Sequence, residues 1–284
     1  MTQRTDPSKR ALSAPGRVKE VTSTANPIVK DIRALAQKKH RDETGLFLAE
    51  GLKLVIDALD AGWEIETLVV ARAALETPLL EKTASRTVAL GADLIEANAK
   101  VLEAITRRDN PQNAIGVFKK RLAPIASLAP KANEVLVALD RVRDPGNLGT
   151  VLRTADAVGA KGVVLVGDTV DPFSLEAVRA TMGSIFAVPV ARASESAFIE
   201  WCASMDAPLV GTHMAGSMDY REPDYGAKGT VLLMGNEQAG LSDTLASACD
   251  ILVRIPQAGR ADSLNLAVAT GVMLFEARRG VLKL

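Results

Sequence analysis

The feature that most constrains the fold is the regular alternation of short apolar runs with longer mixed segments in residues 134–284. The runs "EVLVALD", "GVVLVG", "FAVPV", "PLVGT", "TVLLMG" and "ILVRIP" are apolar almost throughout, which is typical of strands buried on both faces. Helices are predicted at "NLGTVLRTADAVGA", "SLEAVRATMG", "SESAFIEWCAS", "SDTLASACD" and "SLNLAVATGVMLFEARR". Strands that alternate with helices predict an α/β fold with a parallel sheet.

The preceding part of the chain predicts a second, smaller α/β domain. A helix is expected at "NPIVKDIRALAQKK", with Asn26 as its N-cap and Pro27 in its first turn. The strands "GLFLAE", "IETLVVA" and "NAIGVFK" follow, whereas "RLAPIASLAPKAN" has two prolines and no clear period. We therefore expect a flexible basic tail (1–20), a small α/β domain (21–120), a linker (121–133) and the parallel-sheet domain (134–284).

The composition excludes several classes of protein. Two cysteines and two histidines, Cys202, Cys249, His40 and His213, are too few for a disulfide framework or a Cys/His zinc site, so we expect no metal. No apolar run approaches the roughly 18 residues of a membrane helix, so no membrane partner is expected. The basic N-terminus is compatible with a weak organelle-targeting peptide, but a solvated tail on a cytoplasmic protein fits better.

The charge is distributed unevenly, although the net charge is zero. Residues 1–133 contain 21 Lys and Arg against 16 Asp and Glu, and residues 134–284 contain 13 against 18. This asymmetry predicts that the first half meets an anionic partner. Only 4% of the residues are aromatic, which argues against a surface on which bases stack.

The first loop with candidate chemistry is "RVRDPGNLGTVLR", which follows the strand ending at Asp140. It has neither the G-x-G-x-x-G pattern of nicotinamide-binding folds nor the G-x-x-x-x-G-K-[ST] pattern of phosphate loops. Asn147 is compatible with a helix N-cap or with a site residue. Arg153 lies in a helix of small and apolar residues, near the sheet edge where ligands bind. We expect it to face a ligand, and a solvated arginine is the alternative.

Two further loops follow later strands. In "LLMGNEQAGLS", glycines allow a ligand close to the backbone, while Glu237 alone is compatible with an exposed loop acid. In "IPQAGRADSLNLAVATGVMLFEARR", Ser263 fits a helix N-cap, and no G-x-S-x-G elbow supports a nucleophile. The helix that follows is apolar almost all round, which predicts deep burial and makes Asn265 a buried amide that needs partners.

Together, these three loops resemble the signature motifs of the SpoU (TrmH) family of RNA ribose 2′-O-methyltransferases. Residues 147–153 match its N-x-G-x-x-x-R motif, "MGNEQAGLS" the second motif and "IPQAGRADSLNLAVA" the third. The resemblance covers about residues 134–284, and the first domain, with "FLAEGLKLVIDAL", is similar to the RNA substrate-binding domain of many members. It implies a C-terminal α/β knot, which patterns alone do not predict because knots are very rare. It also implies a homodimer formed through the knot domain.

The resemblance further implies that S-adenosylmethionine is held in the knot, mainly by backbone groups. The cofactor-binding residues carried over from the motifs and their neighbours are Thr212, Gly235, Asn236, Ile255, Gln257 and Leu264. Gln257 departs from the family pattern, in which a Met is common at this position.

The catalytic residues that the resemblance implies are Arg153, Asn147, Glu237, Ser263 and Asn265. Arg153 takes the central role. A guanidinium has a pKa above about 12 and is a poor general base. We therefore expect Arg153 to clamp the target phosphate bidentately and to stabilise the forming alkoxide, while a phosphate oxygen or water accepts the proton.

The candidate RNA contacts lie in the first domain. The segment "KDIRALAQKKHR" contains five Lys and Arg against one Asp, and two arginines form a second cluster. A solvated helix face remains the alternative for any single residue. The predicted set is Lys30, Arg33, Lys38, Lys39, Arg41, Arg107 and Arg108.

The expected function is methyl transfer from S-adenosylmethionine to a ribose 2′-hydroxyl of structured RNA. Large-subunit ribosomal RNA is preferred to tRNA, by analogy with two-domain members. A tRNA methyltransferase or a catalytically silent RNA-binding member remains an alternative. A nicotinamide-dependent oxidoreductase is disfavoured because its glycine fingerprint is missing.

Overall fold

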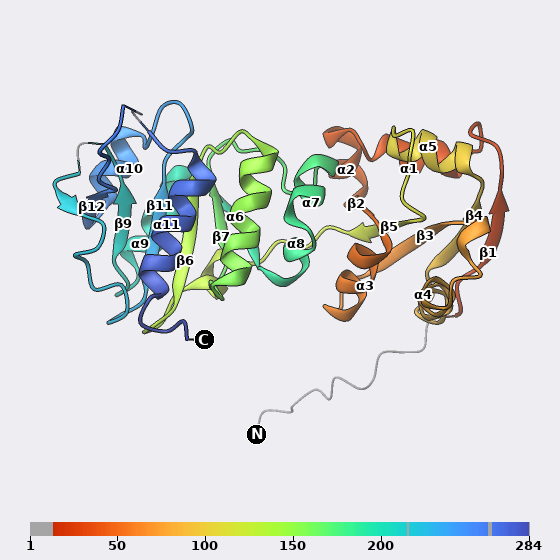
Figure 1. Ribbon diagram of the computed structural model, residues 1–284, viewed down its shortest axis with the longest axis horizontal. Coiled ribbons are helices and arrows are strands. Elements are labelled where there is room, and N and C mark those ends of the chain that lie inside the picture. Colours follow the sequence, from red (N-terminus) through yellow and green to blue (C-terminus); the bar gives the residue numbers. More distant parts are fainter. Residues whose placement is uncertain (1–13, 215, 261–262, 284) are drawn as a thin grey trace, which may run out of the picture. The chain divides into compact units, whose positions relative to one another are not determined.

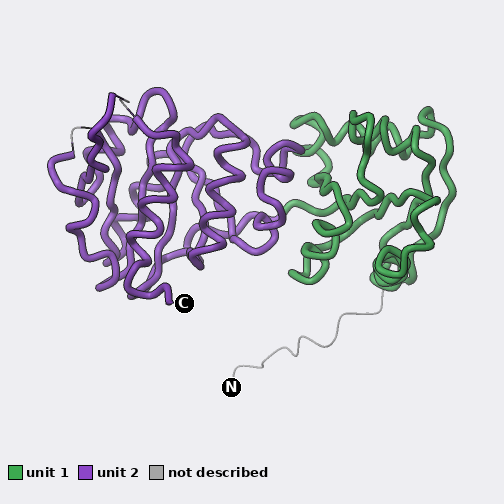
Figure 2. The backbone as a smooth tube through the Cα atoms, viewed as in Figure 1, with its two compact units in different colours: residues 1–120 green, residues 121–284 purple. Residues whose placement is uncertain are grey.

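The computed structural model describes residues 14–214, 216–260 and 263–283, and it divides into two compact units (Figures 1 and 2). Unit 1 comprises residues 1–120 and unit 2 residues 121–284. In the described part of the chain, no helix has the length and apolar character needed to cross a membrane.

Unit 1 is built on a mixed five-stranded sheet with the strand order β1-β4-β3-β5-β2. The pairs β1–β4 and β4–β3 are parallel, whereas β5 is antiparallel to both β3 and β2. The core centres on Phe47, which packs edge-on against Trp63 and tilted against Phe118. The strands are β1 (Val18–Val21), β2 (Leu46–Glu50), β3 (Ile65–Ala71), β4 (Asp93–Ala97) and β5 (Ala114–Lys119). The helices are α1 (Pro27–Ala34), α2 (Lys38–Thr44), α3 (Leu52–Asp60), η1 (Arg72–Ala74), α4 (Pro78–Ala89) and α5 (Ala99–Thr106).

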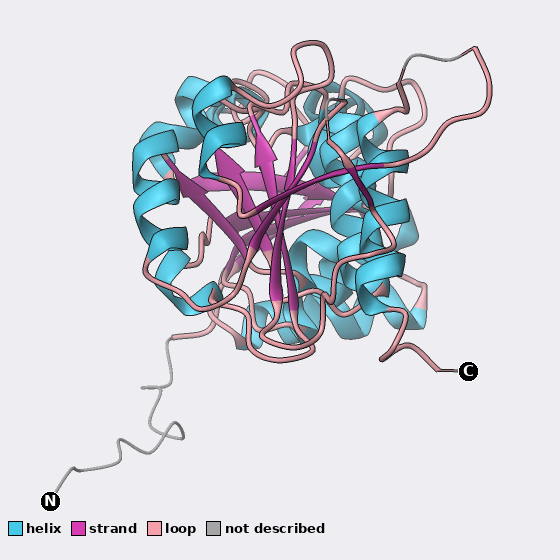
Figure 3. Cartoon of the chain, turned by 90° about the vertical axis from the view of Figure 1, so that its left-hand side faces the viewer, coloured by secondary structure: helices cyan, strands magenta, loops and turns pink. Residues whose placement is uncertain are grey.

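Unit 2 is built on a seven-stranded sheet in which every pair is parallel, with the order β10-β12-β9-β11-β6-β7-β8. Figure 3 shows helices on both sides of the strands, as a parallel sheet requires. The strands are β6 (Val135–Asp140), β7 (Val163–Val166), β8 (Val190–Ala193), β9 (Leu209–Thr212), β10 (Met218–Asp219), β11 (Thr230–Met234) and β12 (Ile251–Arg254). The helices are η2 (Ile125–Leu128), α6 (Pro145–Ala157), α7 (Leu175–Thr181), α8 (Ser184–Ala187), α9 (Glu195–Ala203), α10 (Asp243–Ala248) and α11 (Leu266–Arg278).

The buried strands of unit 2 show why their sequences are continuously apolar. In β6 and β11, alternate residues such as Leu136 and Leu233 belong to the core cluster that contains residues of η2, α9 and α10. On the other face of the sheet, α11 packs against α6, β11 and β6. Each strand therefore buries both sets of side chains, and the predicted fold class is confirmed: a C-terminal parallel-sheet unit preceded by a smaller α/β unit.

Three predictions about the ends of elements are wrong. The predicted tail of residues 1–20 is too long, because β1 pairs in register with β4 and buries Val21; residues 1–13 lie outside the described part. Residues 121–133 are not a free linker, because Leu128 is buried in the core of unit 2. The run "FAVPV" is not one strand: Phe186 lies in α8 and β8 begins at Val190, since Pro189 has no N–H for a ladder.

Candidate functional site

The first cavity of unit 2 has a volume of about 320 Å³ and lies at the carboxyl ends of its parallel strands. Segments from the ends of β9, β11 and β12 and from the loop before α11 form its walls. Ser263 and Glu237 also line it. All six residues predicted to bind the cofactor line this cavity: Thr212, Gly235, Asn236, Ile255, Gln257 and Leu264. The structure thus brings together residues from two motifs and from β9.

The loop after β11 is held in a closed shape by its own backbone. The backbone N–H groups of Asn236 and Gly240 each donate to the other's carbonyl, at 2.9 and 3.0 Å. The Asn236 side chain also accepts hydrogen bonds from the N–H groups of Gln238 and Ala239, at 2.9 and 3.1 Å. A Cβ atom on Gly235 would lie 2.5 Å from the carbonyl carbon of Gly240. Glycine is therefore required at residue 235 for this loop to close.

A chain of hydrogen bonds joins the three motifs. The Asn265 side-chain Nδ2 donates to Asn147 Oδ1 at 2.9 Å, and Asn147 Nδ2 donates to Glu237 Oε1 at 3.2 Å. The Glu237 carboxylate also accepts from the backbone N–H groups of Arg143 and Asp144, at 3.4 and 3.3 Å. Three of the five predicted catalytic residues are thus in direct contact, although they are far apart in the sequence. Glu237 is not a free loop acid.

The three residues of this hydrogen-bond chain line a second cavity, which has a volume of about 700 Å³. Its lining is entirely polar or charged, and it shares Asn236, Glu237 and Gln238 with the first cavity. The remaining lining residues are Arg141, Arg143, Asp144, Asn147 and Asn265. The arrangement is one partly apolar cavity beside a polar one, separated by the hydrogen-bonded loop that carries the Glu237 carboxylate.

The helix caps differ from those expected. Asp144 is the N-cap of α6 and accepts from the Asn147 N–H at 2.6 Å, so the Asn147 side chain is left for the hydrogen-bond chain. Asn265, and not Ser263, caps α11 by accepting from the N–H groups of the first turn. Asn265 was expected to be buried inside the helix, but it is exposed at the helix start. Ser263 is also exposed and lines the first cavity.

Arg153 is on α6, exposed, and lines neither cavity. None of the hydrogen bonds or ion pairs among the described residues holds its guanidinium. Within one chain, the structure therefore does not bring Arg153 to the ligand-facing position expected for it.

Asp140 and Arg141 form a further ion pair at this edge of the sheet, outside the residues predicted for the site. Asp140 ends β6 at 1% exposure, and the Arg141 guanidinium donates to both of its carboxylate oxygens at 2.8 Å. These hydrogen bonds raise the pKa of Arg141. Arg141 has a positive φ of 47°, and its carbonyl accepts from Asn236 Nδ2 at 2.8 Å. The sequence did contain a sign of this pair. Asp140 ends a fully apolar strand, and a buried charge requires a partner.

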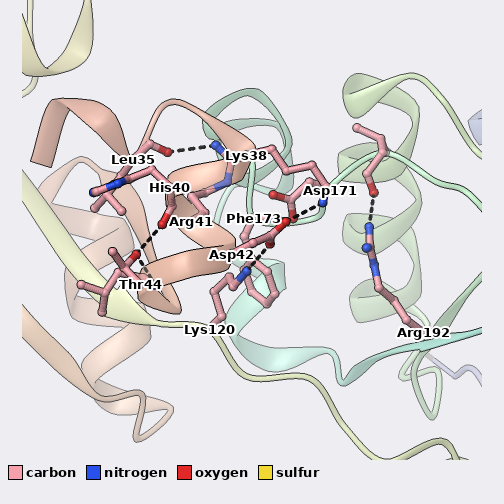
Figure 4. A network of polar contacts seen from close by, with 12 residues as sticks. Leu35, Lys38, His40, Arg41, Asp42, Thr44, Lys120, Asp171, Phe173 and Arg192 are labelled. Atoms are coloured by element: carbon pink, nitrogen blue, oxygen red, sulfur yellow. Dashed lines mark hydrogen bonds and ion pairs between the residues drawn. The ribbon is translucent and has the colours of Figure 1, made fainter. Parts of the chain in front are cut away.

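The predicted RNA contacts separate into distinct groups. Arg41 is 3% exposed and donates to the carbonyls of Leu35 and Ala36 at the end of α1, so the prediction that it binds RNA is wrong (Figure 4). Lys38 and Lys39 are exposed and form ion pairs within α2. The other predicted contacts, Lys30, Arg33, Arg107 and Arg108, are exposed. Among the described residues, no group of three or more His, Cys, Asp and Glu is arranged to hold a metal.

Comparison with protein families identifies both units. Residues 134–275 match the model of the SpoU rRNA Methylase family, and residues 26–116 match that of the MRM3-like substrate binding domain. The 23S rRNA (guanosine(2553)-2′-O)-methyltransferase RlmP of Bacillus subtilis is 32% identical over 261 residues, which cover 92% of this chain and 100% of that protein. The 23S rRNA (uridine(2479)-2′-O)-methyltransferase of Streptomyces viridochromogenes is 32% identical over 257 residues, 86% of each chain.

Solved structures share the fold of nearly the whole chain. The AdoMet-bound rRNA methyltransferase from Sinorhizobium meliloti is 63% identical, with a TM-score of 0.90 over 94% of this chain and 100% of that chain. The SpoU methyltransferase AviRb of Streptomyces viridochromogenes, in complex with AdoMet, is 30% identical, with a TM-score of 0.82 over 90% of this chain and 98% of that chain.

Proposed function

This chain belongs to the SpoU rRNA methylase family, and from that premise we propose that it methylates a ribose 2′-hydroxyl of ribosomal RNA with S-adenosylmethionine as donor. The observation that carries the proposal is the pair of adjoining cavities, one lined by all six predicted cofactor residues and the other by the Asn265–Asn147–Glu237 chain. We further propose that the RNA is that of the large subunit and that the enzyme acts in the cytoplasm.

The first cavity fits the donor chemically. Its volume of about 320 Å³ falls within the range of small-molecule sites. Met234, Val253 and Leu266 supply apolar surface, while Gly235 lets a ligand approach the backbone closely. When bound, S-adenosylmethionine supplies a methyl group on a positively charged sulfur. Transfer of that methyl group to O2′ would leave S-adenosylhomocysteine, and a phosphate oxygen or water would accept the proton of the 2′-hydroxyl.

The chain's own contribution is to align the acceptor. A ribose hydroxyl is a weak nucleophile, and correct alignment alone contributes several kcal/mol to such a reaction. Glu237 stands on the wall shared by the two cavities and is fixed by hydrogen bonds from Asn147, Arg143 and Asp144. We assign Glu237 and Asn147 to holding the ribose hydroxyl. Asn265 ties this pair to the start of α11, and Ser263 faces the donor cavity.

Arg153 retains its proposed role, clamping an RNA phosphate and stabilising the forming alkoxide, but it acts from a second copy of the chain. It lies exposed on α6, which packs against α11. Val268 and Phe275 on α11 are each 54% exposed, so this helix is not buried all round as its sequence predicted. Val268 and Phe275 are seven residues apart and therefore lie on one face of α11, where a partner would cover both. A homodimer through this helical layer accounts for both features.

The reaction is tested by titrating the protein with S-adenosylmethionine and NAD, and by identifying 2′-O-methylated positions in total RNA with and without the gene. We expect S-adenosylmethionine alone to bind, and one or a few large-subunit positions to lose their methyl group. Loss at a tRNA position would replace the proposed substrate. If every position is methylated equally with and without the gene, in cells whose wild type expresses the protein, the silent RNA-binding alternative is favoured.

The dimer is tested with a mixed dimer of one Arg153→Ala chain and one Glu237→Gln chain, purified through two different tags. If Arg153 serves the partner's site, one site of the mixed dimer has both residues and about half of the wild-type activity returns. If Arg153 serves its own chain, neither site is complete and activity stays at the level of the single variants.

Arg153→Lys tests the bidentate geometry, because near-normal turnover with unchanged RNA affinity would exclude it.

A further inference from the structure

The cations of unit 1 divide into those held by neighbours and those left without a partner. Arg17, Lys19, Lys53 and Lys119, for example, form ion pairs with nearby carboxylates. A smaller set of cations in residues 14–120 has side chains that form no ion pair or hydrogen bond with any described residue. Its members are Lys30, Arg33, Lys82, Lys100, Arg107 and Arg108. Fixed pairs neutralise much of a cation's field, so the second set provides the available positive charge.

Three of these unpaired cations line one recess of about 430 Å³ between α1 and α5. Lys30 and Arg33 lie one turn apart on α1, and Arg107 follows the last residue of α5. The other lining residues are Ala34, Gln37, Glu103 and Ala104. The recess therefore has three cations, one carboxylate and no aromatic side chain.

The position of Arg107 is unusual for its residue type. It is the C-cap of α5 and has a left-handed φ of 56°. At the ends of helices, this conformation is usually adopted by Gly or Asn. This backbone conformation makes Gly a compatible replacement, so the charge can be removed without disturbing the helix end.

We infer that this recess is a binding site for phosphate groups of the RNA backbone, and that it, rather than α2, is the RNA contact of unit 1. The inference rests on the proposed function, which makes RNA the substrate. Two guanidinium groups and an ammonium suit phosphate oxygens, because arginine binds them through paired N–H donors. With no aromatic surface in the recess, contacts there position the RNA backbone and do not stack bases.

A structural role for these cations is the alternative. Arg33 is in the last turn of α1 and Arg107 caps α5, where positive charge offsets the negative end of the helix dipole. In that case, their removal lowers stability and leaves RNA affinity unchanged.

The test compares two triple variants of the full-length protein, each with three cations removed from unit 1. The recess variant is Lys30→Gln/Arg33→Gln/Arg107→Gly. The control is Lys38→Gln/Lys39→Gln/Lys53→Gln, whose cations are exposed but paired with acids within their own helices. Affinity for a ribosomal RNA fragment is measured over a range of salt concentrations, together with S-adenosylmethionine affinity and thermal unfolding.

We expect the recess variant to bind RNA at least tenfold more weakly, with the slope of log affinity against log salt reduced by about two. The control should lose no more than about threefold. S-adenosylmethionine affinity should be unchanged in both, and kcat at saturating RNA should be kept. Equal losses in the two variants, or an unchanged salt slope in the recess variant, would overturn the inference.

The wild-type protein separates failure of this inference from failure of the proposed function. If the wild type neither binds nor methylates ribosomal RNA, the proposed function is at fault. If the wild type does both and the recess variant matches it, only the assignment of the recess is wrong. Binding of an acidic peptide that depends on these three residues, with RNA affinity intact, would assign the recess to a protein partner instead.

Discussion

The two units use their polar side chains in opposite ways. In unit 2, a parallel sheet buried on both faces leaves polar side chains to the loops at its edge. There, Asn147 is hydrogen-bonded to Glu237, 90 residues away in the sequence, and to Asn265, 118 residues away. In unit 1, most cations are neutralised by nearby acids. The comparison teaches that the site proposed for unit 2 depends on long-range geometry, whereas the RNA site proposed for unit 1 depends on which charges are left unpaired.

The sharpest way to break this comparison is Glu237→Gln. The Glu237 carboxylate accepts from two backbone N–H groups and from Asn147, and Gln replaces one acceptor oxygen with an amide nitrogen, which can only donate. We expect kcat to fall by roughly 100-fold, because misalignment of the acceptor costs about that much. RNA affinity should stay within about twofold, since no phosphate contact is removed.

The matched control is Glu200→Gln, which removes an exposed carboxylate from α9, away from both cavities. Its single-turnover rate and RNA affinity should equal those of the wild type. If Glu237→Gln instead weakens RNA binding and keeps kcat, the chain of hydrogen bonds belongs to substrate docking and the contrast between the units fails.

A smaller effect is expected from Gly235→Ala. The added methyl group meets the backbone of Gly240 and Leu241 at 2.5 to 2.6 Å, so the loop that separates the cavities must open. We expect S-adenosylmethionine affinity to fall by roughly tenfold, measured by calorimetry. Gly259→Ala is the control in the loop that precedes α11, where a Cβ meets no atom within 4 Å. Equal affinities in the two variants would show that the closed loop is not needed for the donor.

The sequence predicted the parallel sheet well, because strands buried on both faces leave a pattern that few other structures share. Through the resemblance of the motifs, it also indicated six residues that line one cavity, for which a role in binding the donor remains a proposal. It did not distinguish which polar residue caps a helix. Asp144 and Asn147 are both good caps, as are Ser263 and Asn265, and tertiary contacts decide which of each pair does so.

The sequence was least able to predict which charged side chains make internal contacts and which remain accessible. The segment "KDIRALAQKKHR" gave Arg41 the same weight as Arg33, yet Arg41 is buried against helix carbonyls and Arg33 lines a recess. Arg33 lies on α1 and Arg41 on α2, and only the packing of the surrounding residues decides which of the two side chains makes internal hydrogen bonds. The same holds for Arg153, whose exposure depends on whether a second chain covers α6.

The smallest predicted effect concerns the paired charges of unit 1. Asp93 accepts from Lys19 Nζ at 2.7 Å and from the Arg17 N–H at 3.0 Å, and these contacts lower its pKa to about 2. Because the pKa is lower in the folded protein, the stabilisation is fully present above pH 4 and is lost as the pH falls toward 2. Asp93→Asn should therefore cost about 1 kcal/mol of unfolding free energy at pH 7 and only a small part of that at pH 2.

This difference is measured by urea unfolding at several pH values in a Trp201→Phe background, in which Trp63 reports on unit 1 alone. Asp31→Asn is the control, since Asp31 is exposed on α1 and no described residue pairs with it; it should change stability by less than about 0.5 kcal/mol. Methyl transfer at pH 7 should be unaffected by Asp93→Asn, because its ion pairs hold β1 to β4 and no site residue. A large loss of turnover would mean that local pairing in unit 1 also governs the chemistry of unit 2.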